Sequence, residues 1–226
     1  MKRVITALLA ALLALSLAAC GSRVETKKLA GTWTCTIDVT DRMNAAAEQA
    51  LGLSAADGTA QMPLQLVLTV TEDGAYTLRY DSDAARTALD AYAAALRPAA
   101  VESVYAAAEE QGLSREEYDA AMEKAGITMD DMVAAIFAGV DEEELLSLLT
   151  GRSAALTGYC RAESGQLYLA DTAAELAETA DCLSYTLSDG IMTWTDAQGE
   201  LSSQLTEQEQ ELLRVPLTWT KQEESK

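Results

Sequence analysis

The residue with the clearest chemical role in the sequence is Cys20, which directly follows an apolar stretch at the N-terminus. Lys2 and Arg3 are followed by residues 4–19, which are apolar apart from two hydroxyl side chains. A short positive segment, an apolar run and small residues at its end predict a signal peptide over residues 1–19. The run is too short and wrongly flanked to predict a membrane-spanning helix.

The last residues of this leader, Leu17-Ala18-Ala19-Cys20-Gly21, resemble the lipobox of bacterial lipoproteins. The resemblance implies a diacylglyceryl group on the Cys20 sulfur, cleavage before Cys20 and acylation of the new amine. Because one acyl chain anchors only marginally, two or three chains would hold the protein at the extracytoplasmic face of the cell membrane. Residues 20–28 would then link the lipid to the folded domain. An ordinary signal peptide with a nearby cysteine is the alternative.

The sequence contains no recognisable catalytic motif, although carboxylates are abundant. The sequence has no histidine, which excludes Ser-His-Asp and Cys-His mechanisms and any histidine-ligated metal site. Acidic clusters at 81–83, 130–131 and 141–144 could bind a hard cation through oxygen ligands. None has the spacing of an EF-hand, and all lie where helices favour acids, so we expect caps and surface charge, with no metal or cofactor site. A hydrolase with paired carboxylates is a third hypothesis, but 36 acidic residues make chance pairs unavoidable.

Charge and cysteine content limit the partners and the chemistry further. The net charge of −20 opposes binding to nucleic acid and to anionic lipid head groups, and favours a soluble monomer. Three cysteines follow Cys20, namely Cys35, Cys160 and Cys182, and all lie in strand-like runs. A bridge between Cys160 and Cys182 is possible and would leave one thiol over, whereas free buried cysteines would serve as small apolar side chains.

The elements that must position any site are mainly short strands. Residues 32–39 alternate strictly between apolar and polar side chains, which predicts a half-buried strand. Apolar alternation on both sides of Asp73-Gly74 predicts a hairpin. About eight strands without a βαβ rhythm predict an α+β protein with an antiparallel barrel or sandwich. The predicted strands cover residues 32–39, 64–71, 76–80, 154–161, 166–170, 182–187, 191–195 and 215–220.

Helices are predicted in two places. Residues 41–51 form a short helix, and residues 83–151, rich in Ala, Glu and Leu, form an all-helical insertion between the third and fourth strands. Within the insertion we expect helices over 83–96 and 98–112, separated near Pro98, and three compact ones over 114–126, 128–139 and 141–151. Each compact helix has a capping residue, acids in its first turn and a closing glycine. They are too short to be stable alone and must pack against other elements.

Gly31-Thr32-Trp33 on the first strand resembles the G-x-W motif of lipocalins and related calycins. The hairpins at 67–80 and 183–195 and the ending at 216–221 resemble the lipocalin-like domains of bacterial lipoproteins. The resemblance implies a lipocalin-like barrel over residues 29–226, closed at one end, with an optional apolar cavity and a late cationic residue that covers the tryptophan. Lys221 and Arg214 are the candidates for that residue. The helical insertion at 83–151 is not part of the plain barrel.

Two sets of residues are candidate binding sites. The inward aromatic residues could line a pocket for an apolar ligand, or they could simply be the barrel core; these are Trp33, Tyr76, Tyr80, Tyr185, Trp194 and Trp219. The apolar residues of the insertion could form a surface for a partner protein, or a helical core; these are Met122, Met129, Met132, Ile136 and Phe137. The sequence therefore predicts a non-enzymatic, lipid-anchored protein that binds a small apolar ligand in its barrel. The alternative is an interaction module that binds an envelope protein through its helices.

Overall fold

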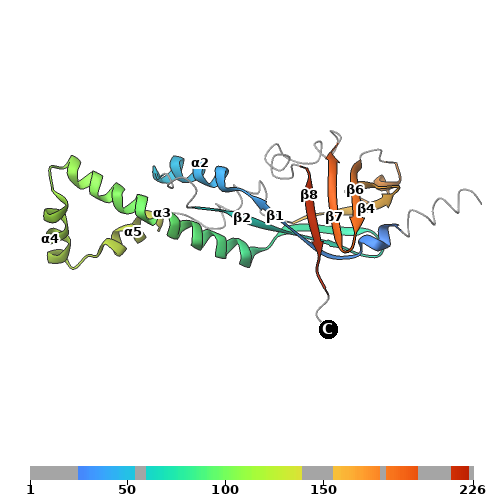
Figure 1. The fold of residues 1–226 in the computed structure, drawn as a ribbon, viewed down its shortest axis with the longest axis horizontal. Helices are drawn as coiled ribbons and strands as arrows, with labels where there is room; N and C mark the ends of the chain where they lie inside the picture. Colours follow the sequence, from blue (N-terminus) through green and yellow to red (C-terminus); the bar gives the residue numbers. More distant parts are fainter. Residues whose placement is uncertain (1–24, 54–59, 139–154, 179–181, 198–214, 224–226) are drawn as a thin grey trace, which may run out of the picture. The chain divides into compact units, whose positions relative to one another are not determined.

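The computed structural model describes residues 25–53, 60–138, 155–178, 182–197 and 215–223 (Figure 1). The chain forms two compact units. One, the barrel unit, contains the chain up to Cys35, Leu66–Tyr80 and the chain from residue 154 onward. The other, the helical unit, contains Thr36–Gln65 and Asp81–Ser153.

The barrel is closed by eight antiparallel strands, each paired with its neighbour in sequence. The strands are β1 (Gly31–Asp38), β2 (Pro63–Val70), β3 (Ala75–Tyr80), β4 (Leu156–Glu163), β5 (Gln166–Ala170), β6 (Cys182–Ser188), β7 (Ile191–Ala197) and β8 (Leu217–Lys221). Pairing between β1 and β8, with Trp33 opposite Lys221 and Thr34 opposite Thr220, closes the ring. The predicted antiparallel barrel of about eight strands is confirmed.

Tight turns connect the strands at one end of the barrel. The expected Asp73-Gly74 hairpin is present, and Leu68 of β2 lies opposite Leu78 of β3. The central residues of the turns after β4 and β6 all have positive φ, as in type I′ hairpins, at 164–165 and 189–190. Because successive strands reverse direction, the turns after β2, β4 and β6 share this end with residues 25–29, which form a helical turn just before β1. A short 3₁₀ turn, η1 (Glu175–Ala177), follows β5.

No disulfide joins the described cysteines Cys35, Cys160 and Cys182, so the bridge considered between Cys160 and Cys182 is not formed. The reason lies in the strand order. Cys160 is on β4 and Cys182 is on β6, and β5 lies between these strands, with Leu169 opposite Cys160 and Tyr168 opposite Cys182. Two strand spacings amount to about 9.5 Å, which is beyond the Cα separation that a disulfide can span.

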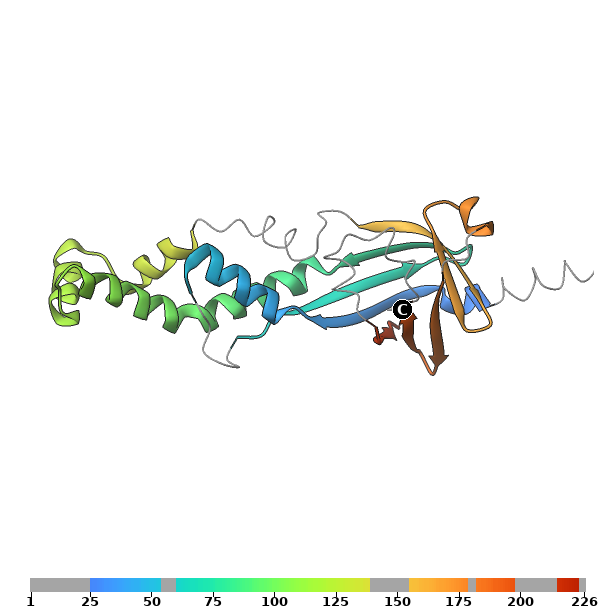
Figure 2. The same ribbon diagram turned by 90° about the horizontal axis from the view of Figure 1, so that it is seen from above.

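The described part of the helical unit contains four α-helices. They are α2 (Thr40–Leu51), α3 (Ser82–Glu110), α4 (Arg115–Ala125) and α5 (Met129–Phe137). Within this unit α3 packs against α4 and α5 (Figure 2). Leu53, Ala100 and Val133 form its buried apolar cluster. The expected helix over 141–151 lies outside the described residues.

The break that we expect near Pro98 is wrong, because α3 is one continuous helix of 29 residues with Pro98 inside it. Proline removes one backbone hydrogen bond, to the carbonyl of Ala94. Ala94 and Pro98 are both exposed, so water can bind that carbonyl. Leu96 and Ala100 are buried on the other face, and their packing holds the helix together across the proline.

The predicted helix caps of α4 and α5 are confirmed as capping boxes. The Ser114 hydroxyl accepts the N–H of Glu117, whose carboxylate accepts the N–H of Ser114. Thr128 and Asp131 exchange the same pair of hydrogen bonds at the start of α5. In this way each short helix satisfies two of the backbone donors left free at its N-terminus.

Candidate functional site

The six aromatic residues singled out from the sequence lie on strands of the barrel. Trp33 and Trp219 are fully buried, Tyr76, Tyr185 and Trp194 are buried, and Tyr80 is half-buried. The structure brings Trp194 and Trp219 together, with ring centroids 4.9 Å apart. Their indole N–H groups are buried without a hydrogen-bond acceptor among the described residues. Five of the six therefore belong to the packed interior of the barrel.

The described residues enclose a small cavity inside the barrel. Tyr76 and Trp194 line a cavity of about 20 Å³, together with aliphatic residues and Cys160. A cavity of that size holds roughly one water molecule, whereas pockets for small-molecule ligands usually measure about 300–1,000 Å³. The barrel interior that the described residues enclose is thus filled by their own side chains.

Residues 25–29 close one end of the barrel. Leu29 is 1% exposed and lines the barrel cavity. Its carbonyl accepts the indole N–H of Trp33 at 2.7 Å. The hydroxyl of Thr26, which is 6% exposed, accepts the N–H of Ala162 at 3.0 Å. These contacts hold residues 25–29 against β1 and β4.

The cationic residue expected over the tryptophan is Lys221. Its Nζ lies 5.3 Å from the centroid of the Trp33 ring. A Cβ at Gly31 would lie 2.8 Å from Cε of Lys221, so the glycine makes room for the lysine stem. Arg214, the other candidate, is outside the described residues.

The five residues expected as a partner surface are all half-buried. Met129, Ile136 and Phe137 pack against the Leu53–Ala100–Val133 cluster of the helical unit. Met122 and Met132 lie on α4 and α5. Three of the five thus contribute to the helical core.

Large exposed apolar residues in the described parts of the helical unit are Leu113 and Ile127, at 37% and 43% exposure. Each directly precedes a capping residue, Ser114 or Thr128. That is the position of a hydrophobic staple, in which the residue before the cap packs against the first turn of the helix. Helix initiation is therefore sufficient to explain both residues, and they do not define a binding patch.

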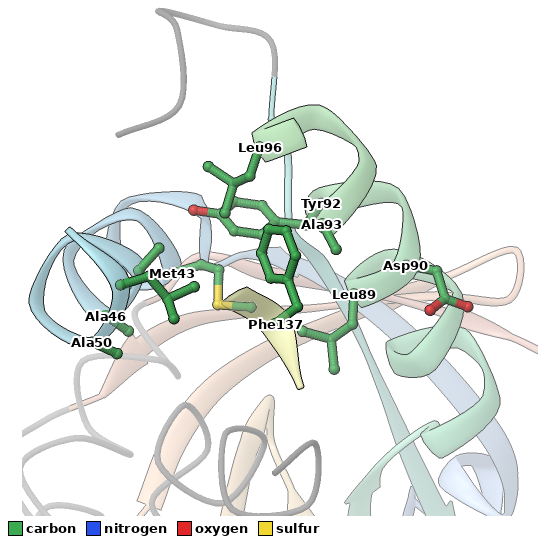
Figure 3. A pocket seen from close by; sticks show the side chains of 11 residues that line it. Met43, Ala46, Ala50, Leu89, Asp90, Tyr92, Ala93, Leu96 and Phe137 are labelled. Atoms are coloured by element: carbon green, nitrogen blue, oxygen red, sulfur yellow. The ribbon is translucent and has the colours of Figure 1, made fainter. Parts of the chain in front are cut away.

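The helical unit does contain an apolar pocket, between α2, α3 and the end of α5 (Figure 3). Its volume is about 240 Å³. Figure 3 shows the side chains of Met43, Tyr92 and Phe137 between α2 and α3. The lining residues are Met43, Ala46, Ala47, Ala50, Leu51, Leu89, Asp90, Tyr92, Ala93, Leu96 and Phe137.

The polar groups at this pocket are few. The hydroxyl of Tyr92 donates a hydrogen bond of 2.7 Å to Oδ1 of Asn44, which joins α3 to α2. Burial raises the pKa of Tyr92 above its ordinary value of 10.0. The carboxylate of Asp90 points away from the other labelled side chains (Figure 3). The pocket thus presents an apolar wall with one hydroxyl that is already paired.

Of the pocket residues, Phe137 alone is also one of the candidate binding residues predicted from the sequence. The signal for the others was nevertheless present, because both helices repeat the same spacing. Positions 43, 46, 47 and 50 of α2 and positions 89, 92, 93 and 96 of α3 each follow the i, i+3, i+4, i+7 pattern of one helix face. The pattern predicts two apolar stripes, but it does not say that the stripes face each other.

Comparison with known proteins found no matching family model, no similar curated protein and no similar solved structure. Among the helices described, none is long and apolar enough to cross a membrane. The described ranges also contain no group of three or more Cys, Asp or Glu side chains that could hold a metal ion.

Proposed function

We propose that the protein is a lipid-anchored, non-enzymatic binding protein of the bacterial cell envelope, with a lipocalin-like barrel and a small apolar ligand. The observation that carries the binding function is the 240 Å³ apolar pocket of the helical unit. The cavity that the described residues enclose in the barrel is roughly tenfold smaller. We therefore assign ligand binding to the helical unit and a supporting role to the packed barrel.

Support for a lipocalin-like barrel comes from the seam between β1 and β8. Trp33 of the G-x-W motif is buried beneath the side chain of Lys221, from the last strand. The helical turn at 25–29 precedes β1 and closes the end of the barrel at which Lys221 ends β8. A closed end, a buried tryptophan and a covering cation are the features that the resemblance implies.

Support for a membrane-bound location comes from the lipobox and from the position of the N-terminal segment. The chain is fixed to the barrel from Glu25 onward, because the Glu25 carboxylate accepts the N–H of Ser164 at 2.7 Å. The stretch from Cys20 to Glu25 spans at most about 18 Å, at roughly 3.6 Å per residue. A lipid on Cys20 would hold this end of the barrel within about that distance of the membrane surface.

The test is mass spectrometry on the full chain expressed in a bacterial host and purified from its membranes. We expect a mature N-terminus at Cys20 that carries two or three acyl chains, together with a small molecule that is lost on denaturation. The Cys20→Ala variant should leave the membrane fraction, whereas Cys182→Ala should stay in it. An unmodified Cys20 would overturn the lipid anchor. Failure of purified protein to bind any apolar probe would overturn the binding function.

A further inference from the structure

The apolar pocket between α2 and α3 has a size and lining that define a class of ligand. We propose that it binds a small uncharged molecule built around a single ring, such as an alkylbenzene. This inference rests on the ligand-binding part of the proposed function and is independent of the lipid anchor. It adds the site and the chemical class of the ligand.

The volume of the pocket indicates the size of its ligand. A dry apolar cavity of about 150 Å³ in a protein core is sufficient to bind benzene. At about 240 Å³, this pocket can accept such a ring and a few more heavy atoms. It is below the range of about 300–1,000 Å³ that is usual for larger ligands. The pocket is partly open to solvent, so a long acyl chain or a fused polycyclic molecule would fit only in part and would leave apolar surface in water.

The alanines create the space. Ala46, Ala47 and Ala50 of α2 and Ala93 of α3 line the pocket, and none of these side chains extends beyond Cβ. Leu89, Leu96 and Phe137 bound the pocket with larger apolar groups. The pocket therefore exists because small residues lie on the facing sides of α2 and α3. A larger side chain at one of these positions would fill it.

The polar groups exclude charged ligands. The Tyr92 hydroxyl is already paired with Asn44, and the described residues that line the pocket include no cationic side chain. The one acid, Asp90, is exposed and directed away from the interior (Figure 3). A charged group inside would lose its hydration without gaining a partner, which is strongly unfavourable. An uncharged apolar molecule loses no such hydration.

The test uses toluene as the probe and methionine methyl groups as reporters. The protein is the mature chain with Cys20→Ala, labelled with ¹³C at its methionine methyls and observed by NMR. Met43 lines the helical pocket, whereas Met192 lines the barrel cavity. We expect toluene to shift the Met43 signal saturably and to leave the Met192 signal unchanged. Benzylamine and benzoate, which carry the same ring and a charge, should bind at least tenfold more weakly.

Two alanine substitutions give a matched comparison. Ala93→Leu should fill the pocket and weaken toluene binding at least tenfold. Ala94→Leu makes the same chemical change at the next position of α3, which is exposed and does not line the pocket, and should leave binding unchanged. Ala46→Leu fills the pocket from α2 and replaces Ala93→Leu if that variant does not fold.

Several results would overturn the inference. A saturable shift of Met192 without Met43 would place the ligand in the barrel and would keep the proposed binding function. If no methionine signal shifts saturably, both this inference and the proposed binding function are overturned. Equal affinity for toluene in Ala93→Leu and Ala94→Leu would exclude the pocket as the site. A ligand-free dimer in sedimentation that Ala93→Leu dissociates would show that a second copy of the chain occupies it.

Discussion

The Nζ atom of Lys221 lies 5.3 Å from the centroid of the Trp33 indole ring. The two residues are also backbone partners across the β1–β8 seam that closes the barrel. Trp33 is fully buried, and its indole N–H is bound to the carbonyl of Leu29. A single tryptophan therefore connects the last strand, the first strand and the segment that closes the end of the barrel.

We expect Lys221→Met to lower the free energy of unfolding by about 0.5–1 kcal/mol, because it keeps the apolar stem over Trp33 and removes the cation–π attraction. Lys221→Ala should lower the free energy of unfolding further, because it removes the apolar stem as well. Urea unfolding followed by tryptophan fluorescence measures both, because Trp33, Trp194 and Trp219 all lie in the barrel unit. Lys28→Met, at another exposed lysine, is the control and should have little effect. Equal effects at positions 221 and 28 would contradict a specific contact.

Gly74→Ala should destabilise the barrel by more than about 2 kcal/mol. Gly74 has a φ of +91°, and a Cβ there would lie 2.4 Å from the carbonyl oxygen of Cys160. The left-handed conformation alone costs an alanine about 1–2 kcal/mol, and relief of the clash must displace β4. Gly165→Ala is the matched control, because its φ is +76° and its nearest contact would be an ordinary 3.5 Å. Similar urea midpoints for the two variants would contradict the clash.

Thr26→Val should lower the free energy of unfolding by about 1–3 kcal/mol, because it leaves the buried N–H of Ala162 without its acceptor. Thr26→Ser keeps the hydroxyl and should retain most of the stability. Hydrogen exchange provides the specific measurement. The amide of Ala162 should exchange faster in Thr26→Val than in Thr26→Ser. Unchanged protection in Thr26→Val would show that residues 25–29 do not hold the end of the barrel.

The barrel was predictable because its signals are local. Strict alternation along residues 32–39 fixes which side chains face inward, and Asp-Gly pairs at 73–74 and 189–190 fix the hairpins. The capping boxes at Ser114 and Thr128 could be read for the same reason, since each one lies within four consecutive residues. Local chemistry does not specify whether two distant cysteines form a disulfide, or which helix faces pack together.

Pro98 and the helical pocket show two ways in which local patterns are insufficient. At Pro98 the backbone rule predicts a break, but burial of Leu96 and Ala100 outweighs one lost hydrogen bond that water can replace. At the pocket, the apolar stripes of α2 and α3 predict buried faces, which is correct for Met43, Leu89 and Tyr92. The space left between the stripes depends on the distance between two helices that are about 40 residues apart in sequence, and composition does not give that distance.

Arg115 should lower the pKa of Glu102 in the folded protein through hydrogen bonds of 2.6 and 3.1 Å and its positive charge. The ionised carboxylate is favoured in the folded state, so this contribution is present above the ordinary pKa of 4.5 and is lost as the pH falls through the lowered value. An NMR titration of the Glu102 carboxyl group measures the shift. Arg115→Gln should raise the pKa of Glu102 toward 4.5, whereas Arg97→Gln, which removes a different pair with Asp130, should not.

The thiols should differ in reactivity, because Cys160 and Cys35 are buried and Cys182 is half-buried. Burial raises the pKa of the Cys160 thiol to about 12, from an ordinary 9.0, and also raises that of Cys35. Since the thiolate is the reactive form, iodoacetamide at pH 8 should label Cys182 first, with Cys35 and Cys160 labelled only on unfolding. Peptide mass spectrometry of the Cys20→Ala protein identifies each modified residue.

The same burial predicts how stability depends on pH. Above pH 9 the thiol of Cys160 ionises in the unfolded chain but stays protonated in the fold, until the pH reaches about 12. Stability should therefore fall as the pH rises from about 9 toward 12, and Cys160→Ala should make the decline less steep. Urea unfolding at a series of pH values measures this slope, and an identical slope in Cys160→Ala would show that this thiol does not ionise differently in the two states.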